Sequence, residues 1–208
     1  MTNLDLKKVL DKMLEMAEMI LDFSKINRVT LHYDKISPES DTDHTVMLSV
    51  MACALAKEFY SELDLGKVSQ FAIIHDLVEV YAGDTNTISM TEELLADKMQ
   101  RENLALLKIK DKFSSDFPWI HETIEEYESL KTKEARFVKT LDKLLPCLTV
   151  VLNSGAQFKD NMGVLDDIGN LHNKIIKAAA ENYAKEFPDL IKLYLFLTDK
   201  ILEINSKL

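Results

Sequence analysis

The chain has 208 residues, of which 47% are hydrophobic, so it is long enough to bury a sizeable core in one large domain or two small ones. Its formal net charge of −10 argues against non-specific binding to duplex nucleic acid, which depends on clustered Lys and Arg to neutralise phosphates. Only five Gly and four Pro interrupt a sequence rich in helix-forming residues, so we predict an all-α protein.

The cysteines and the N-terminus bear on the cellular compartment. Cys53 and Cys147 form no CxxC pattern and fall in predicted helices, so we expect reduced thiols in a core rather than a structural zinc site. The N-terminus lacks the apolar stretch of a signal peptide, and no window reaches the roughly 18 uncharged apolar residues of a membrane span. These features predict a cytoplasmic protein that does not enter a membrane.

Apolar residues recur at helical spacing along most of the chain, which predicts a bundle of about seven to nine helices. We expect helices over residues 4–23, 44–60, 68–82, 91–113, 116–128, 132–152, 166–186 and 188–204. Residues 24–43 lose this periodicity and are expected to form a long irregular connection, a kind of segment that is often functional. Pro146 predicts a bend in its helix, because it cannot donate to the carbonyl of Asp142.

Four ionisable side chains interrupt an otherwise apolar run at residues 71–84: His75, Asp76, Glu79 and Asp84. Burying such groups without a partner is costly, and an ion pair, a hydrogen-bond network or a bound metal offsets the cost. His75 offers an imidazole nitrogen and Asp76 a carboxylate, while Glu79 falls on the same face of the expected helix as His75. We therefore predict that this run contributes to a metal site.

Two further polar residues lie on apolar helix faces, His44 at the start of its helix and Asp142 in the helix over 132–152. Two imidazoles and two carboxylates, with water completing an octahedron, suit Mn, Fe, Co or Mg better than a tetrahedral structural zinc. Open water positions on such an ion indicate catalysis. The structural alternatives are a satisfied core histidine at position 44 and an ion pair between Asp142 and Lys139 or Arg136.

The order His44, then His75–Asp76, then Asp142 resembles the pattern of the HD-domain metal-dependent phosphohydrolases. The flanking segments resemble the subgroup that contains the 5′-deoxynucleotidases: PESDTDH at 38–44, HDLVEVYAGD at 75–84, EEYE at 125–128 and FVKTLDK at 137–143. The longer matches are far more specific than a bare His-Asp pair.

The likeness covers about residues 20–155, and no repeat, low-complexity tract or linker divides the chain. We therefore expect a single HD-type helical domain over residues 1–208, with the motif-bearing core at about 20–155 and the C-terminal helices over 160–205 packed on it. The resemblance also implies a homodimer.

The resemblance implies hydrolysis of a (deoxy)nucleoside 5′-monophosphate or a similar small phosphomonoester, with release of phosphate. It implies one divalent metal ion as the cofactor, Mn, Co, Fe or Mg, held by the two histidines and two aspartates of the pattern. The ion would lower the pKa of a bound water and polarise a phosphoryl oxygen for an in-line displacement.

Further roles follow from the same likeness. Glu79 would orient the water or a ligand, and Asp84 would act as a general acid–base. Arg28, before the first histidine, and Lys143, after the last aspartate, are candidates to bind the phosphate. The structural alternatives are a salt bridge for Glu79, a loop cap for Asp84 and a contact between Arg28 and the C-terminal end of the first helix. Val29 follows Arg28, whereas the nucleotidase members carry an aromatic residue near this arginine.

Other functions remain open at this point. One is hydrolysis of a pyrophosphate or a cyclic signalling nucleotide, and another is a non-catalytic HD-fold module that binds or senses a nucleotide. A two-iron oxygenase would need additional histidine ligands, for which His32 and His121 are the nearby candidates. His32, His121 and His172 all lie in polar surroundings that favour surface or loop positions.

Overall fold

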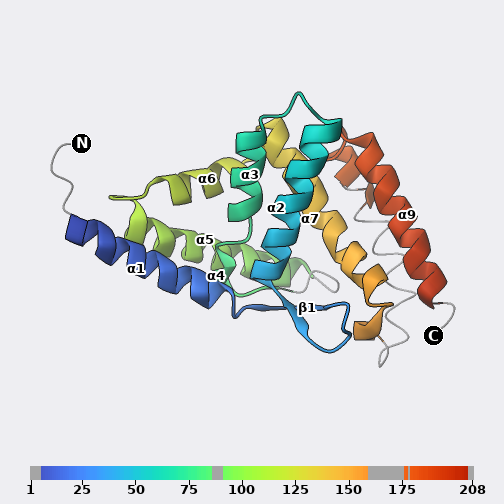
Figure 1. The fold of residues 1–208 in the computed structure, drawn as a ribbon, viewed down its shortest axis with the longest axis horizontal. Coiled ribbons are helices and arrows are strands. Elements are labelled where there is room, and N and C mark those ends of the chain that lie inside the picture. Colours follow the sequence, from blue (N-terminus) through green and yellow to red (C-terminus); the bar gives the residue numbers. More distant parts are fainter. Residues whose placement is uncertain (1–5, 86–90, 159–175, 178, 206–208) are drawn as a thin grey trace.

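The computed structural model describes residues 6–85, 91–158, 176–177 and 179–205 (Figure 1). Its helices are α1 (Leu6–Phe23), α2 (Asp41–Phe59), α3 (Leu65–Ile74), α4 (Glu79–Ala82), α5 (Glu92–Phe113), α6 (Trp119–Glu128), α7 (Lys133–Leu152) and α9 (Pro188–Asn205), with a short 3₁₀-helix, η1, at Ala156–Phe158. Eight α-helices thus lie within the described residues, and the predicted all-α class is confirmed. Of the helix expected over 166–186, residues 166–175 and 178 lie outside these residues, while residues 176–177 and 179–181 are helical.

The predicted irregular connection is wrong in one respect, because it contains a small antiparallel sheet. Strand β1 (Asn27–Leu31) pairs with β2 (Pro38–Ser40), with Asn27 opposite Ser40 and Leu31 opposite Pro38. The Asp34 carboxylate closes the turn between them by accepting hydrogen bonds from the backbone amides of Ile36 and Ser37, both at 2.9 Å. Strands this short and polar carry little alternation, so the sequence pattern did not reveal them.

The helix expected over 68–82 is also interrupted. Asp64 caps α3 by accepting from the amides of Gly66 and Lys67, so this helix begins earlier than predicted, and it ends at Ile74. Tight i→i−3 hydrogen bonds follow, including Leu77 N to Ile74 O and Glu79 N to Asp76 O, before α4 begins. The break lies at the His-Asp pair.

Three apolar clusters join the helices. The first holds α2, α3, α6 and α7 together around Leu48, Phe71, Tyr127 and Leu141, all 1% exposed or less. The second lies among α1, α3, α5 and α6 and the turn between α3 and α4, and the third packs α9 on α7. α7 therefore contributes to two of the three clusters, and Figure 1 shows it between α2 and α9.

α7 continues past Pro146 to Leu152. The bend predicted at Pro146 and the division of the whole chain into a single domain stay predictions. None of the helices in the described ranges has the length and apolar character that a membrane crossing requires.

Candidate metal centre

The first turn of α2 carries His44 and is held by a reciprocal cap. The Ser40 hydroxyl accepts from the Asp43 amide at 3.2 Å, and the Asp43 carboxylate accepts from the Ser40 amide at 3.0 Å. This cap fixes the direction of α2 where the chain leaves the β1–β2 sheet. It places His44, which is fully buried, toward α7.

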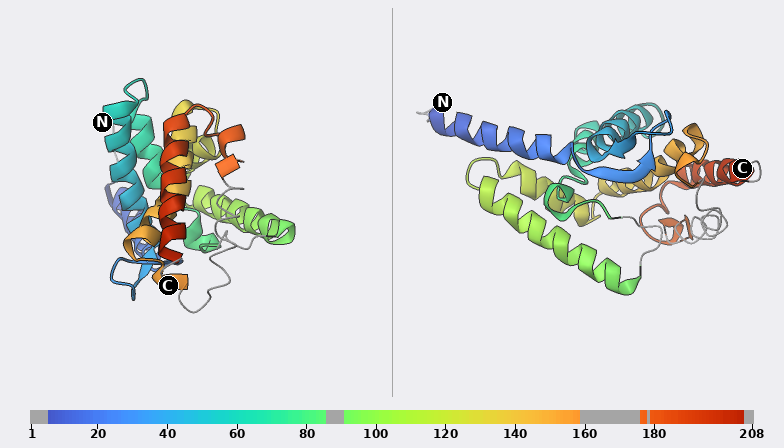
Figure 2. Two further views of the ribbon diagram at one scale, coloured as in Figure 1. Left: turned by 90° about the vertical axis from the view of Figure 1, so that its right-hand side faces the viewer. Right: turned by 90° about the horizontal axis from the view of Figure 1, so that it is seen from below.

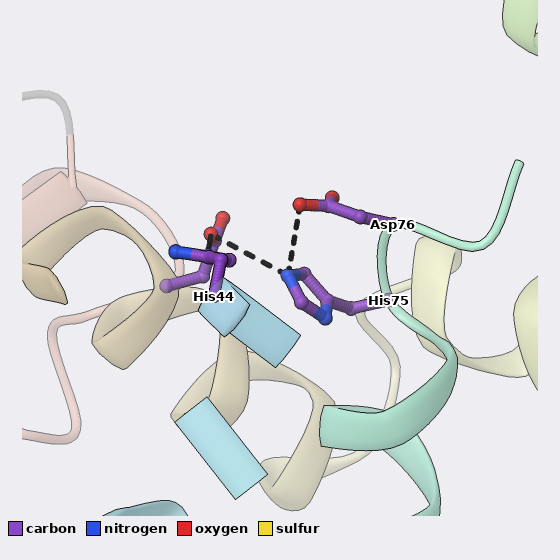
Figure 3. A group of neighbouring side chains, drawn as sticks. His44, His75 and Asp76 are labelled. Atoms are coloured by element: carbon purple, nitrogen blue, oxygen red, sulfur yellow. Dashed lines mark hydrogen bonds and ion pairs between the residues drawn. The ribbon is translucent and has the colours of Figure 1, made fainter. Parts of the chain in front are cut away.

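Four side chains meet at this level: His44 from α2, His75 and Asp76 from the turn after α3, and Asp142 from α7. Each offers one ligand atom, and these atoms all lie within 4.8 Å of one another. His44 Nε2 lies 3.1 Å from Asp142 Oδ1, and His75 Nε2 lies 2.9 Å from Asp76 Oδ2. Figure 3 shows the His75 ring and the Asp76 carboxylate facing one another. The structure therefore brings together the four residues that the sequence predicts as metal ligands.

The His75 ring provides the clearest sign that this cluster suits a cation. Its Nδ1 lies 2.9 Å from the Ala72 carbonyl, which can only accept a hydrogen bond, so Nδ1 carries the proton. The other ring nitrogen, Nε2, then faces Asp76 Oδ2 at 2.9 Å and Asp142 Oδ1 at 3.7 Å. This buried nitrogen has no hydrogen-bond partner among the described residues. A divalent ion bound between His75 Nε2 and the carboxylates of Asp76 and Asp142 would give each of these atoms a partner, so the residues present fit a divalent metal ion.

Both aspartates of the cluster are held in the charged form. Burial by itself raises the pKa of Asp142, but Lys143, His44 and other neighbours lower it well below its ordinary value. Burial likewise raises the pKa of Asp76, and His75 and Arg28 lower it below its ordinary value. The cluster thus offers two negative charges to a cation.

His44 is charged in the metal-free protein. Burial lowers the pKa of His44, but its interactions with Asp142 and Glu39 raise it to about 9. Glu39 Oε1 lies 3.6 Å from Nδ1 of this ring, and Thr30 donates a hydrogen bond to the other Glu39 oxygen. A carboxylate behind a ligating histidine orients the ring, so Glu39 is suited to support His44.

A second acidic group adjoins the first and consists of Asp41, Glu79 and Asp84, which also have ligand atoms within 4.8 Å of one another. The sequence placed Glu79 on the same helix face as His75, and this was wrong, because the break after Ile74 turns Glu79 toward Asp41 instead. Burial and neighbouring carboxylates raise the pKa of Glu79 to about 10 and that of Asp41 to about 6. Glu79 therefore keeps a proton at neutral pH in the metal-free protein.

Arg28 links the two acidic groups. Its Nη1 lies 3.2 Å from Asp76 Oδ2 and 3.3 Å from Asp41 Oδ1, and its side chain is 14% exposed. Burial lowers the pKa of Arg28, but Asp76 and the surrounding carboxylates raise it above its ordinary value. Arg28 lies in β1, and its guanidinium pairs with these two carboxylates.

Lys143 pairs with one of the four residues of the metal cluster, Asp142. Its Nζ is 3.0 Å from Asp142 Oδ2, and its side chain is 35% exposed. Asp84 is also half-buried and lies two residues beyond the end of α4 at Ala82. Lys143 and Asp84 therefore each lie beside one of the acidic groups and are partly accessible to solvent.

Asp41 is the residue that the sequence interpretation missed. It belongs to a stretch rich in N-capping residues, so its carboxylate was interpreted as part of the helix cap and not as part of a site. The reciprocal cap uses only Ser40 and Asp43, however, so Asp41 has no capping role and is fully buried. The sequence did offer one indication of it: residues 38–44 contain more acidic side chains than a helix cap requires.

Among the described residues, His32 and His121 do not join either group. His121 was expected at the surface, but it is 5% exposed in α6, since its ring lies on the side of α6 that faces the interior. His32 lies 3.2 Å from Asp43 Oδ2. Within the described residues, neither extends the clusters as a two-iron site would require. His172 lies outside these residues.

Comparisons with known proteins agree with this geometry. A family model described as an HD domain matches residues 23–183. The 5′-deoxynucleotidase HDDC2 of Dictyostelium discoideum is 35% identical over 113 residues, covering 51% of this chain and 58% of that protein. The human 5′-deoxynucleotidase HDDC2 is 27% identical over 133 residues, covering 63% of each chain. The chain thus matches less than two thirds of the length of these relatives.

A solved structure also shares the fold. The crystal structure of a predicted metal-dependent phosphohydrolase from Magnetospirillum magnetotacticum superposes with a TM-score of 0.71 at 24% identity, over 94% of this chain and 93% of that one. At this identity the likeness concerns the fold. The family model, in contrast, matches the sequence itself over well more than half of the 208 residues, including all four residues of the metal cluster. The chain belongs to the HD-domain family.

Proposed function

We propose that this protein is a metal-dependent phosphohydrolase that releases phosphate from a (deoxy)nucleoside 5′-monophosphate or a similar small phosphomonoester. The observation that carries the proposal is the buried Nε2 of His75, which has no hydrogen-bond partner among the described residues and faces the carboxylates of Asp76 and Asp142. The names of the relatives, 5′-deoxynucleotidase, support the same substrate class.

The proposed cofactor is one divalent ion, Mn, Co, Fe or Mg, held by His44, His75, Asp76 and Asp142. When bound, the ion supplies a Lewis acid for a phosphoryl oxygen and increases the acidity of a bound water. Two neighbouring groups of the protein orient the histidine ligands. The Ala72 carbonyl fixes the tautomer of His75, and Glu39 stands behind His44.

The proposed substrate contacts are cationic. Arg28 binds the phosphate, since its guanidinium already lies between Asp41 and Asp76 and presents a planar set of donors. Lys143 neutralises further phosphate charge from its half-exposed position beside Asp142. An anionic substrate can therefore approach an otherwise acidic site at these two side chains.

The proposed proton-handling groups are Glu79 and Asp84. Glu79 is buried and orients the water or a ligand through a carboxyl group that holds a proton at neutral pH in the metal-free protein. Asp84, adjacent to it and half-buried, serves as the general acid–base, because it has access to solvent as well as to the site.

A phosphate-release screen tests this function. Mono-, di- and cyclic nucleotides are incubated separately with Mn, Co, Mg and Fe, and phosphate from a 5′-monophosphate is the expected product. Asp76→Ala should abolish release while the helical circular dichroism signal persists, and Asp111→Ala, at an exposed position on α5, should behave as wild type. Full activity of Asp76→Ala would refute the proposed site.

The same screen separates the alternatives. Turnover only of a pyrophosphate or cyclic nucleotide would indicate a different hydrolase, and tight nucleotide binding without turnover under all four metals would indicate a sensor module. We also propose a cytoplasmic location and a homodimer, which are supported by the sequence pattern and by the family likeness. Cell fractionation and a mass measurement in solution test these two points.

A further inference from the structure

The segment that carries Asp84 packs on a helix that contributes no residue to the metal cluster. The four residues of that cluster come from α2, α7 and the turn after α3, whereas Asp84 follows α4. Ala82 of α4 shares an apolar cluster with Ala105 of α5. Lys98 of α5 also places its Nζ 3.7 Å from Glu79 Oε1. In both views of Figure 2, α5 lies at the edge of the molecule with α4 beside it. The position of Asp84 therefore depends on α5.

The backbone changes direction immediately before Asp84. Gly83 ends α4 with a φ of 74° and a ψ of 149°, a conformation that L side chains rarely adopt. No atom of the described residues lies within 4 Å of the place where a Cβ on Gly83 would be, so the conformation and not a lack of space requires glycine here. The Gly83 amide donates to the Glu79 carbonyl at 2.7 Å. The Ala82 carbonyl is left at the end of the helix and needs a partner from another element.

Arg101 on α5 bonds to both sides of this turn. Its Nη1 donates to the Ala82 carbonyl, and its Nη2 donates to Thr85 Oγ1 at 2.8 Å. Its Nε donates to Asp97 Oδ2 at 2.9 Å, one turn earlier on α5, and this bond orients the guanidinium plane. One side chain is thus bonded to the residue two positions before Asp84 and to the residue directly after it.

We propose that Arg101 is a positioning residue that holds Asp84 in place for proton transfer through its bonds to the two neighbouring residues. The inference rests on the proposed hydrolysis, in which Asp84 is the general acid–base. Asp84 has a ligand atom within 4.8 Å of those of Asp41 and Glu79, although the three acids come from different elements. A general acid–base must lie within hydrogen-bond reach of the proton that it transfers, so a small displacement of Asp84 slows the reaction.

A surface ion pair does not account for these contacts. The side chains of Arg101 and Asp97 are 34% and 60% exposed, so their contact alone would be an ordinary surface pair of little consequence. The other two nitrogens, however, bond to the carbonyl of the buried Ala82 and to a hydroxyl of a different segment. Bonding in three directions at once requires the planar fork of arginine, which the single ammonium of a lysine lacks. The geometry therefore indicates that Arg101 fixes the turn before Asp84.

Steady-state kinetics on the monophosphate that the phosphate-release screen identifies test this role. Arg101→Gln should lower kcat by roughly 10- to 100-fold, because the acid–base is displaced, and should leave KM about unchanged, because Arg28 and Lys143 keep their phosphate contacts. Arg101→Lys should also be slow, because it cannot bond to both sides of the turn. A wild-type kcat in Arg101→Gln would overturn the inference.

Arg136→Gln on α7 is the matched control. This arginine likewise bonds to an acid through Nε, at 2.6 Å from Glu186, and to the backbone carbonyls of residues 130 and 131 through Nη1. It contacts neither acidic group among the described residues, so its variant should keep the wild-type kcat. An equal loss of kcat in both variants would mean that a general loss of stability is responsible, and would overturn the inference.

A double variant tests whether Arg101 acts through Asp84. Asp84→Asn alone removes the acid–base and should lower kcat by about 10²- to 10⁴-fold. Adding Arg101→Gln to it should cause no further loss, since both changes act on the same step. Losses that multiply in the double variant would overturn the inference.

Hydrogen exchange separates a failure of this inference from a failure of the proposed hydrolysis. In Arg101→Gln the amide of Gly83 should exchange roughly tenfold faster, because the end of α4 has lost a partner, while Arg136→Gln leaves this rate unchanged. A wild-type protein that is inactive on every nucleotide of the screen would refute the hydrolysis, and the exchange rate of Gly83 would then decide whether Arg101 holds the turn. An unchanged rate would overturn the inference.

Discussion

Replacing Asp76 with Asn should remove the response of this protein to divalent metal while leaving its fold. Asp76 Oδ2 lies 2.9 Å from His75 Nε2, and the surrounding groups keep this carboxylate charged. The amide retains the shape of the side chain but removes one of the two negative charges that face the ion. Removing one partner of a buried charged contact costs about 3–5 kcal/mol, so metal affinity should fall on the order of a hundredfold or more.

The expected magnitude can be measured as a thermal shift. Metal at about 100 times its dissociation constant stabilises the folded state by about 2.7 kcal/mol. For a chain of this size that corresponds to a rise in melting temperature of roughly 5–10 °C. Under the same conditions Asp76→Asn should rise by less than about 1 °C, because its site is then far from saturation.

Differential scanning calorimetry with and without each of Mn, Co, Fe and Mg makes this measurement without reference to any substrate. Asp111→Asn, at an exposed position on α5, is the matched control and should keep the full shift. A full metal-dependent shift in Asp76→Asn would refute the reasoning, as would a wild-type protein that responds to none of the four ions.

Three further predictions concern the surroundings of the site. Arg28→Ala leaves Asp41 and Asp76 without their shared cation and should lower the free energy of unfolding by about 3–5 kcal/mol in a denaturant titration; a loss below 1 kcal/mol would contradict the buried pairing. Metal affinity should rise about tenfold per pH unit and level off near pH 9, because His44 in the metal-free protein has a pKa of about 9 and must release its proton. Calorimetric titration of metal in two buffers of different ionisation enthalpy measures the number of protons released. A metal affinity that is unchanged between pH 7 and 8.5 would exclude proton release from His44. Ser40→Ala removes the cap of α2 and should cost about 1 kcal/mol of unfolding free energy by denaturant titration, with no loss contradicting the capping role.

Local patterns in the sequence were sufficient for several features of this protein. The all-α class and most helix ends follow from apolar periodicity and from capping residues such as Thr132, whose effects extend over a few residues. The four cluster positions could also be found, since His75 and Asp76 interrupt an apolar run and His44 and Asp142 are polar residues on apolar helix faces. A buried polar group is conspicuous in sequence because its cost must be offset.

Only the tertiary structure decided how the neighbouring groups are arranged. The chain breaks its helix after Ile74, and Glu79 lies beside Asp41, although the helical periodicity of the sequence continues through this point. Arg28 reaches Asp76 because β1 pairs with β2, a contact between short polar segments that have little local signal. Burial and charge at these positions arise from elements distant in sequence, which no local pattern contains.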